Sequence, residues 1–125
     1  MYDHIGLRVK DVEASIRFYE AALGALGHEL CSRSESGAGF GPGGEAGLWL
    51  YRTSGPHGGA SAGSGAHVAF RAADRAAVDR FHAAGLAAGG RDNGAPGLRP
   101  DYGPTYYGAF LIDPDGNNVE AVFTG

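Results

Sequence analysis

The chain has 125 residues, the length of one ordinary domain, and 43 % of them are apolar, which is enough for a hydrophobic core. Its formal net charge is −4 and it has no basic stripe, so duplex nucleic acid is excluded as a partner. No apolar run approaches the roughly 20 residues that span a bilayer. The start of the chain lacks a secretion signal, and the single cysteine, Cys31, excludes an internal disulfide, so we expect a cytoplasmic protein that does not enter a membrane.

The first half of the chain is predicted to form one strand, one helix and three short strands. Apolar residues alternate with others over residues 5–9, which is the pattern of a half-buried strand. Asp11 is a good N-cap for the helix that follows, and Gly24 and Gly27 suit its C-terminal end. Apolar positions recur at helical spacing between them, so one face of this helix is apolar. Three further strands are predicted near residues 28–35, 38–41 and 47–53.

The second half repeats this order after a glycine-rich segment, residues 54–65, which is interpreted as a linker. A strand over residues 67–71 leads to a helix that Asp74 caps. A long loop is expected over residues 94–105, and residues 113–116 (Asp-Pro-Asp-Gly) form a tight-turn sequence between the last two strands. The three strands of this half are predicted near residues 91–95, 106–113 and 117–124.

An internal repeat relates the two halves. When residues 4–27 are laid over residues 67–90, the leading histidine, two arginines, the capping aspartate and a phenylalanine each fall on the same residue type. The repeat is too long for a solenoid unit and occurs only twice, so it indicates a duplicated half-domain. We predict a single α+β domain over residues 1–125, with module one at about 1–53 and module two at about 66–125.

Three segments resemble a known family in their order and spacing. They are Asp3-His4-Ile5-Gly6-Leu7, the pair Phe18-Tyr19, and residues 107–110 running into residues 113–120. Together they make the chain similar to the vicinal-oxygen-chelate superfamily, the group of glyoxalases, bleomycin-resistance proteins and ring-cleaving dioxygenases. The resemblance covers nearly the whole chain. It implies two βαβββ modules related by a pseudo-twofold axis, forming a curved, mostly antiparallel sheet with helices on the outer face.

The two histidines that open the repeats are expected on one face of this sheet. Because residues 5, 7 and 9 should face the helix, His4 faces the concave side, and the repeat puts His67 in the equivalent position. A lone histidine at a strand end is commonly a hydrogen-bonded structural residue, but two equivalent ones favour a shared role. Glu120 lies in an apolar strand, and burying its carboxylate without a partner costs several kcal/mol. Its partner is therefore a metal ion or, as the structural alternative, an arginine.

Two histidines and one carboxylate match a facial arrangement that leaves metal positions open, so we predict that His4, His67 and Glu120 bind one divalent ion. Such ligands suit Fe, Mn, Co, Ni or Zn, and the sequence does not select among them. In glyoxalase I enzymes that resemble this chain, a fourth ligand comes from the strand in which Trp49 aligns with Glu120. Because an indole N–H only donates, Trp49 cannot replace that ligand. The resemblance is thus closer to thiol transferases and extradiol dioxygenases than to lactoylglutathione lyases, and the small size is nearer the transferases.

Further side chains are candidates for contacting a substrate, although no catalytic residue is predicted. Trp49 is expected to line the pocket. The arginines share the face of the histidines, where they hold an anionic substrate or only face solvent or a subunit interface. The tyrosines, with Arg99, either close over a ligand or form an ordinary aromatic loop. These candidates are Trp49, Arg8, Arg71, Tyr102, Tyr106 and Tyr107, whereas three histidines are expected at the surface, namely His28, His57 and His82.

The pattern favours a glyoxalase- or dioxygenase-like, metal-dependent enzyme whose small-molecule substrate chelates a divalent metal through oxygens. Its reaction would be that of a lyase or isomerase, a thiol transferase or a dioxygenase. One alternative is a metal-free protein that binds and sequesters a drug, as bleomycin-resistance proteins do, and another is a structural or regulatory module with a vestigial site. A homodimer is expected because a curved sheet with open edges gains from being covered.

Overall fold

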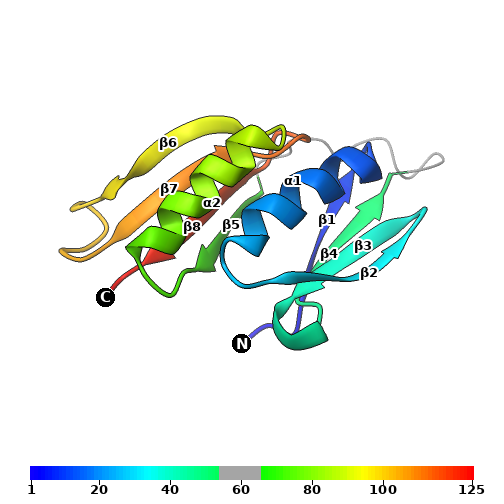
Figure 1. Cartoon of the computed structure of the whole chain (residues 1–125), viewed down its shortest axis with the longest axis horizontal. Helices are drawn as coiled ribbons and strands as arrows, with labels where there is room; N and C mark the ends of the chain where they lie inside the picture. The colour runs from blue at the N-terminus through cyan, green and yellow to red at the C-terminus, as the bar shows by residue number, and fades with distance from the viewer. Residues whose placement is uncertain (54–65) are drawn as a thin grey trace.

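The computed structural model describes residues 1–53 and 66–125, so the expected linker at 54–65 lies outside the described residues. The first module contains β1 (Ile5–Val9), α1 (Val12–Gly24), β2 (Glu29–Ser34), β3 (Gly37–Gly41), a 3-10 turn η1 (Pro42–Gly44) and β4 (Leu48–Arg52). The second module contains β5 (His67–Arg71), α2 (Arg75–Ala87), β6 (Arg91–Leu98), β7 (Tyr107–Ile112) and β8 (Asn118–Phe123). This order confirms the predicted βαβββ repeat (Figure 1).

The two helices occupy equivalent positions in the repeat and have the same length. α1 starts at Val12 and α2 at Arg75, 63 residues later, and both helices contain 13 residues. Each is capped as predicted, because the side chain of Asp11 accepts the N–H of Ala14 at 3.1 Å and the equivalent contact at Asp74 measures 2.7 Å. The duplication inferred from the sequence is therefore a duplication of structure.

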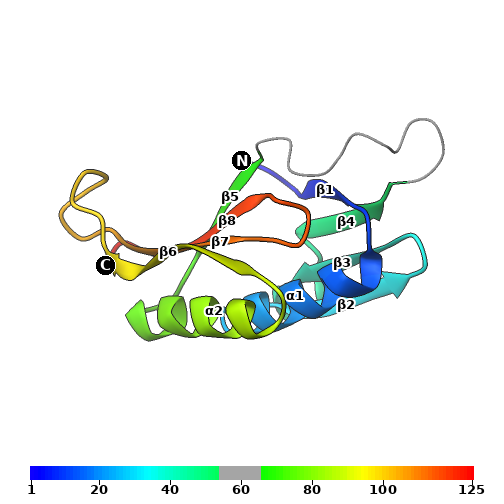
Figure 2. The same cartoon turned by 90° about the horizontal axis from the view of Figure 1, so that it is seen from above.

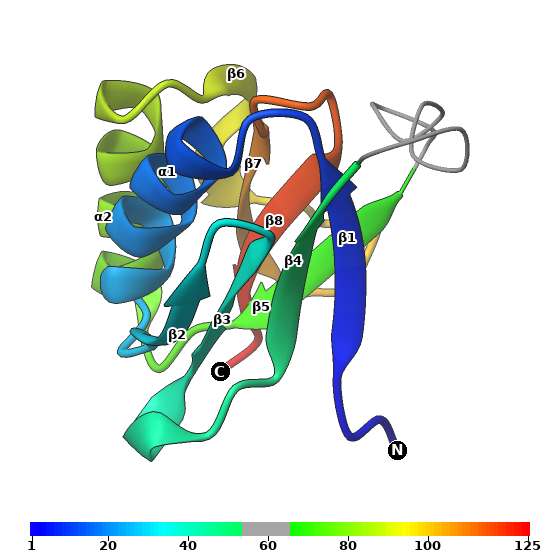
Figure 3. The same cartoon turned by 90° about the vertical axis from the view of Figure 1, so that its right-hand side faces the viewer.

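The strands form two separate four-stranded sheets with the orders β1-β4-β3-β2 and β5-β8-β7-β6. In each sheet the first and last strands of the module pair in parallel, and the other neighbours pair antiparallel. Both helices lie on the same side of the sheets (Figure 2), and neither described helix covers the other side of β1, β4 and β8 (Figure 3). We call that uncovered side the open face. Among the described helices, none is long and apolar enough to cross a membrane.

The core lies between the sheets and the helices, where α1 and α2 also contact each other. A glycine of α2, Gly85, makes this close packing possible. A Cβ at Gly85 would stand 2.3 Å from Leu111 Cδ1 and 3.2 Å from the ring of Phe18, both of which are fully buried. Gly90 allows the same close approach, since a Cβ at this position would lie 2.4 Å from the Phe18 ring. The two modules thus approach each other through their helix layer.

The turn between β7 and β8 also joins the modules. Residues 113–116 form the predicted tight turn, with Gly116 at a φ of 91°. The buried carboxylate of Asp113 accepts a hydrogen bond from Tyr19 Oη on α1 at 2.5 Å, and Asp115 accepts the backbone N–H of Lys10 at 3.0 Å. Burial, followed by the nearby Asp113 carboxylate, raises the pKa of Tyr19 well above its usual value. The phenol therefore stays neutral and donates.

Two local predictions were wrong. The predicted strand at 91–95 continues to Leu98, because two shifts of register against β7, at glycines in the strand, absorb the residues that do not pair. Pro96 is accommodated because β6 is an edge strand and Pro96 falls in the second register shift, where it has no partner on β7. His82, expected at the surface, is only 9 % exposed because it lies on the buried face of α2, and its Nε2 contacts Asp92 at 2.9 Å. His28 is half-buried, and His57 lies outside the described residues.

Candidate functional site

The open face of the second sheet holds a buried carboxylate beside an imidazole. β5 and β8 pair in parallel with Ala69 opposite Glu120, so the alternation of side chains puts His67 and Glu120 on the same face. His67 Nε2 lies 3.0 Å from Glu120 Oε1, and the Glu120 side chain is only 3 % exposed. Gly108 on β7 leaves the space for it, because a Cβ there would stand 3.2 Å from Glu120 Oε2.

Tyr106 satisfies the second oxygen of this carboxylate. Its hydroxyl donates a hydrogen bond to Glu120 Oε2. Burial and this hydrogen bond raise the pKa of Tyr106 to about 12, so the phenol is a neutral donor near pH 7. The Tyr106 ring also packs edge-on against Tyr102, with ring centroids 5.2 Å apart. The glutamate is therefore held by one group on each oxygen.

Two asparagines extend the network on the other side of the imidazole. The Asn118 side-chain amide contacts His67 Nδ1 at 2.6 Å, and Asn93 Nδ2 donates to Asn118 Oδ1 at 3.2 Å. The ring of Phe110 lies 6.2 Å from the imidazole centroid. Contacts on both ring nitrogens therefore fix the plane of the His67 ring.

His4 does not join this cluster within one chain. It lies just before β1, where Nδ1 contacts Asp3 at 2.7 Å, and half of its side chain is exposed. Across residues 1–53 and 66–125, no group of three or more His, Cys, Asp or Glu side chains is arranged to hold an ion. The modules pack through their helices and the β7–β8 turn, and not through the open faces. A metal site shared by His4, His67 and Glu120, from one chain or from two, therefore stays a prediction.

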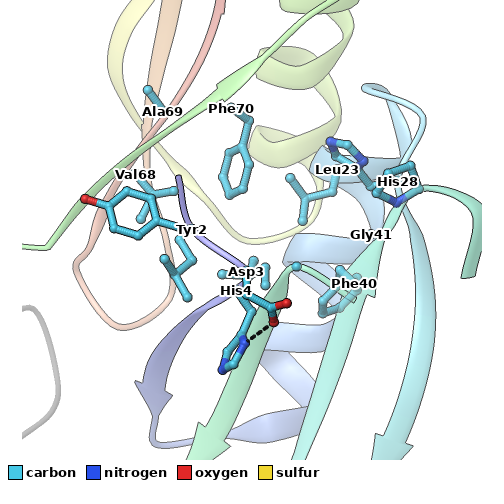
Figure 4. Close-up of a pocket in the computed structure, with 14 residues that line it drawn as sticks. Tyr2, Asp3, His4, Leu23, His28, Phe40, Gly41, Val68, Ala69 and Phe70 are labelled. Atoms are coloured by element: carbon cyan, nitrogen blue, oxygen red, sulfur yellow. Dashed lines mark hydrogen bonds and ion pairs between the residues drawn. The ribbon is translucent and has the colours of Figure 1, made fainter. Parts of the chain in front are cut away.

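His4 instead lies at the edge of a cavity of about 310 Å³ between the first module and β5 (Figure 4). Leu23, Phe40 and Phe70 contribute apolar lining to this cavity. His28 also lines it. Its Nδ1 is buried and has no hydrogen-bond partner among residues 1–53 and 66–125, and burial lowers the pKa of the imidazole. The cavity can take a small, mostly apolar molecule.

The register places Trp49 at the position that Glu120 occupies in the second sheet. Trp49 pairs with Gly39 on β3, as Glu120 pairs with Phe110 on β7. A Cβ on Gly39 would stand 2.8 Å from indole Cζ3, so the indole covers that glycine on the open face. The alignment of Trp49 with Glu120 is therefore confirmed, whereas a role in contacting substrate stays a prediction.

The remaining predicted substrate contacts fall into separate places. Arg8 and Arg71 are exposed on the edge strands β1 and β5, and neither forms an ion pair within the described ranges, so neither is the partner of Glu120. Tyr107 faces the helices, where its hydroxyl donates to Asp79 at 2.7 Å and Arg75 lies 5.0 Å from the ring centroid. Of the three predicted tyrosines, the structure brings Tyr102 and Tyr106 together near Glu120 and leaves Tyr107 on the other face.

Sequence reasoning missed several residues of the site. Asn118 shares a face with Glu120 by simple alternation, and that signal was sufficient to find it. Asn93, Phe110 and Gly108 had no comparable signal, because their positions depend on the irregular pairing of β6 with β7 and on the pairing of β7 with β8. The site therefore contains more of the second module than the predicted ligand set indicated.

Comparisons with known proteins agree with this architecture. A family model described as the Glyoxalase/Bleomycin resistance protein/Dioxygenase superfamily matches residues 2–121. A solved glyoxalase/bleomycin resistance protein from Albidiferax ferrireducens T118 is 33 % identical, with 98 % of this chain and 97 % of that chain covered and a TM-score of 0.79. A glyoxalase/bleomycin resistance protein/dioxygenase from Nocardioides is 25 % identical, with coverages of 95 % and 80 % and a TM-score of 0.64.

A lactoylglutathione lyase from Agrobacterium tumefaciens shares the fold at 23 % identity, with coverages of 95 % and 90 % and a TM-score of 0.66. No curated protein matches the chain. The family model nevertheless covers nearly the whole chain. The two modules of the chain also have the βαβββ order that the sequence predicted. The chain belongs to the glyoxalase/bleomycin resistance protein/dioxygenase superfamily.

Proposed function

We propose that this protein is a metal-dependent enzyme whose small-molecule substrate chelates a divalent ion through oxygens. The observation that carries the proposal is the pair formed by His67 and Glu120. A carboxylate that is 3 % exposed lies 3.0 Å from an imidazole nitrogen, on a sheet face that neither described helix covers. Burying a carboxylate in this way is costly unless a cation or strong donors compensate for the lost water.

The donor set fits a first-row divalent metal in its chemistry. Imidazole nitrogen and carboxylate oxygen together suit Fe, Mn, Co, Ni or Zn, and the only cysteine, Cys31, is outside the set. Two side chains from one chain are fewer than the three protein ligands of typical catalytic sites. His4, which is equivalent to His67 in the repeat, is the proposed third ligand.

A second copy of the chain is the proposed source of that third ligand. β1 and β5 are both edge strands in the described sheets, and each carries a ligand histidine at or just before its first residue. If the first module of one copy lies beside the second module of another, His4 reaches the open face that holds His67 and Glu120. This proposal makes the protein a homodimer with two equivalent sites.

The residues around the pair have distinct proposed roles. A bound metal would act as a Lewis acid toward an oxygen of the substrate. Tyr106 is a neutral hydrogen-bond donor next to the Glu120 oxygen, and Asn118 holds the plane of the His67 ring. Trp49 is proposed to supply an apolar wall from the facing module of the second copy. The reaction belongs to the lyase or isomerase, thiol transferase or dioxygenase types of the family.

Glu120→Gln tests the proposal, because it removes the only anionic ligand while nearly preserving shape. We expect protein purified without chelator to contain a divalent metal by elemental analysis, and the variant to bind that metal at least about 100-fold more weakly. Glu20→Gln is the matched control, since Glu20 makes the same chemical change on the exposed side of α1. Equal calorimetric affinities in the wild type and in Glu120→Gln would contradict the metal site.

A metal-free protein that sequesters a small apolar molecule is the second candidate. The observation that favours it is the cavity of about 310 Å³ lined by Leu23, Phe40 and Phe70. Under this alternative, purified protein contains no stoichiometric metal, and an apolar ligand raises the melting temperature of wild type and Glu120→Gln equally. Elemental analysis combined with that thermal shift separates the two functions.

A further inference from the structure

A second hollow, of about 300 Å³, lies next to the His67–Glu120 pair on the second module. It is lined by Asn93, Gly94, Arg99, Tyr102, Phe110 and Asn118. Asn118 belongs to both places, because its amide contacts His67 and its side chain lines the hollow. A molecule in this hollow would therefore lie beside the candidate metal ligands.

The cation of the hollow is Arg99, which is held in position without an acidic partner. Its Nη2 donates to the carbonyl oxygen of Ala95 at 2.6 Å, and its guanidinium carbon lies 5.4 Å from the ring centroid of Phe110. No carboxylate within the described ranges forms an ion pair with it, and no residue that lines the hollow is acidic. Nη1 also donates to the carbonyl oxygen of Leu98, at 3.5 Å. A guanidinium has five N–H donors, so the others stay available to a ligand.

The other groups that line the hollow indicate which chemical groups a bound anion would carry besides its charge. Tyr102 is 66 % exposed and packs edge-on against Tyr106, which leaves much of its ring uncovered beside Arg99. Phe110 adds a second aromatic ring, and the Asn93 amide adds a neutral hydrogen-bonding group. A planar fork of donors on an aromatic base recognises carboxylates in bidentate fashion, and the rings favour a flat apolar body.

We propose that this hollow binds the carboxylate of a small, flat carboxylic acid, with Arg99 as the residue that selects the charge. The substrate class that follows is an aromatic or unsaturated acid that presents its chelating oxygens toward His67 and Glu120. This part of the inference rests on the proposed function. Anion binding by Arg99 does not itself require the metal.

Benzoate and its neutral analogue benzamide are the probes, titrated calorimetrically into the full-length protein at pH 7, both chelator-treated and metal-loaded. We expect benzoate to bind the chelator-treated protein at least about tenfold more tightly than benzamide, as charge-assisted hydrogen bonds do. Arg99→Gln should remove this preference, and Arg99→Lys should restore only part of it because lysine lacks the fork. Arg91 is an exposed arginine on β6, the strand that also carries Asn93 and Gly94. Arg91→Gln should therefore leave the preference for benzoate within about twofold of the wild-type value.

The outcomes separate this inference from the proposed function. Failure of benzoate to bind at millimolar concentration, equal binding of benzamide, or full benzoate affinity in a folded Arg99→Gln variant would each overturn the carboxylate site. If the protein takes up no divalent metal by elemental analysis, even after metal loading, the metal enzyme is contradicted, and Arg99-dependent benzoate binding in that protein still supports the carboxylate site. Circular dichroism melting of each variant establishes that it is folded.

Discussion

The two modules share one scaffold and differ in what they place on its open face. Glu120 of the second sheet has Trp49 as its counterpart, and the partner on the neighbouring strand is Phe110 in one sheet and Gly39 in the other. The first face therefore carries an indole lying over a glycine, whereas the second carries a buried carboxylate in a hydrogen-bonded network. The duplicated backbone thus supplies equivalent positions, and a few side chains decide what each open face presents.

The helices differ in the same selective way. Tyr19 on α1 and His82 on α2 are equivalent in the repeat, and both are buried against a carboxylate. Tyr19 reaches Asp113 in the other module, whereas His82 reaches Asp92 in its own. Of the pair Tyr19 and His82, only Tyr19 joins the two modules, just as of the pair Trp49 and Glu120 only Glu120 lies in the hydrogen-bonded network.

The largest effect in this comparison, after the loss of Glu120 itself, is expected from Asn118. Asn118→Leu removes the contact on His67 Nδ1 while keeping the volume, so the imidazole loses its fixed orientation. We expect metal affinity to fall about 10- to 100-fold by calorimetry. Asn93→Ala, which removes only the next hydrogen bond along the network, should have a smaller effect. Unchanged affinity in Asn118→Leu would show that the network does not orient a ligand.

The contact between modules predicts a loss of stability that depends on pH. Tyr19→Phe leaves the buried Asp113 carboxylate without one donor, which should lower the free energy of unfolding by about 1–3 kcal/mol. The pKa of Tyr19 is raised in the folded state, so its contribution is full below the ordinary pKa of 10.0 and is lost as pH rises above it. Denaturant unfolding should therefore show the gap between wild type and variant shrinking above about pH 10. A gap that widens there would contradict this assignment.

The scaffold could be predicted from the sequence because its signals are local. Alternation predicted β1 and β5, and the capping aspartates Asp11 and Asp74 predicted both helix starts to the residue. The face that holds Glu120 followed from the same alternation.

The rest depends on contacts between distant segments. Tyr106 reaches Glu120 only because the bulged β6 and the following loop return the chain to β7, and no periodic pattern encodes that path. The position of His4 relative to His67 depends on how whole modules pack. Local patterns therefore predicted which face of a strand a side chain occupies, but not which distant side chains lie together.

The smallest expected effects on stability come from substitutions that give one helix the residue found at the equivalent position of the other. Gly85 on α2 is equivalent to the buried Ala22 on α1, and Gly24 on α1 is equivalent to Ala87 on α2. Gly85→Ala gains about 1 kcal/mol of helix propensity, but its Cβ meets Leu111 at 2.3 Å and Phe18 at 3.2 Å, so overpacking of about 1–3 kcal/mol should outweigh the gain. Gly24→Ala meets nothing within 4 Å and has no positive φ, so it should stabilise the protein by about 0.5–1 kcal/mol. Thermal unfolding of both variants measures the two signs, and stabilisation by Gly85→Ala would mean that the helices do not require a glycine where they meet β7.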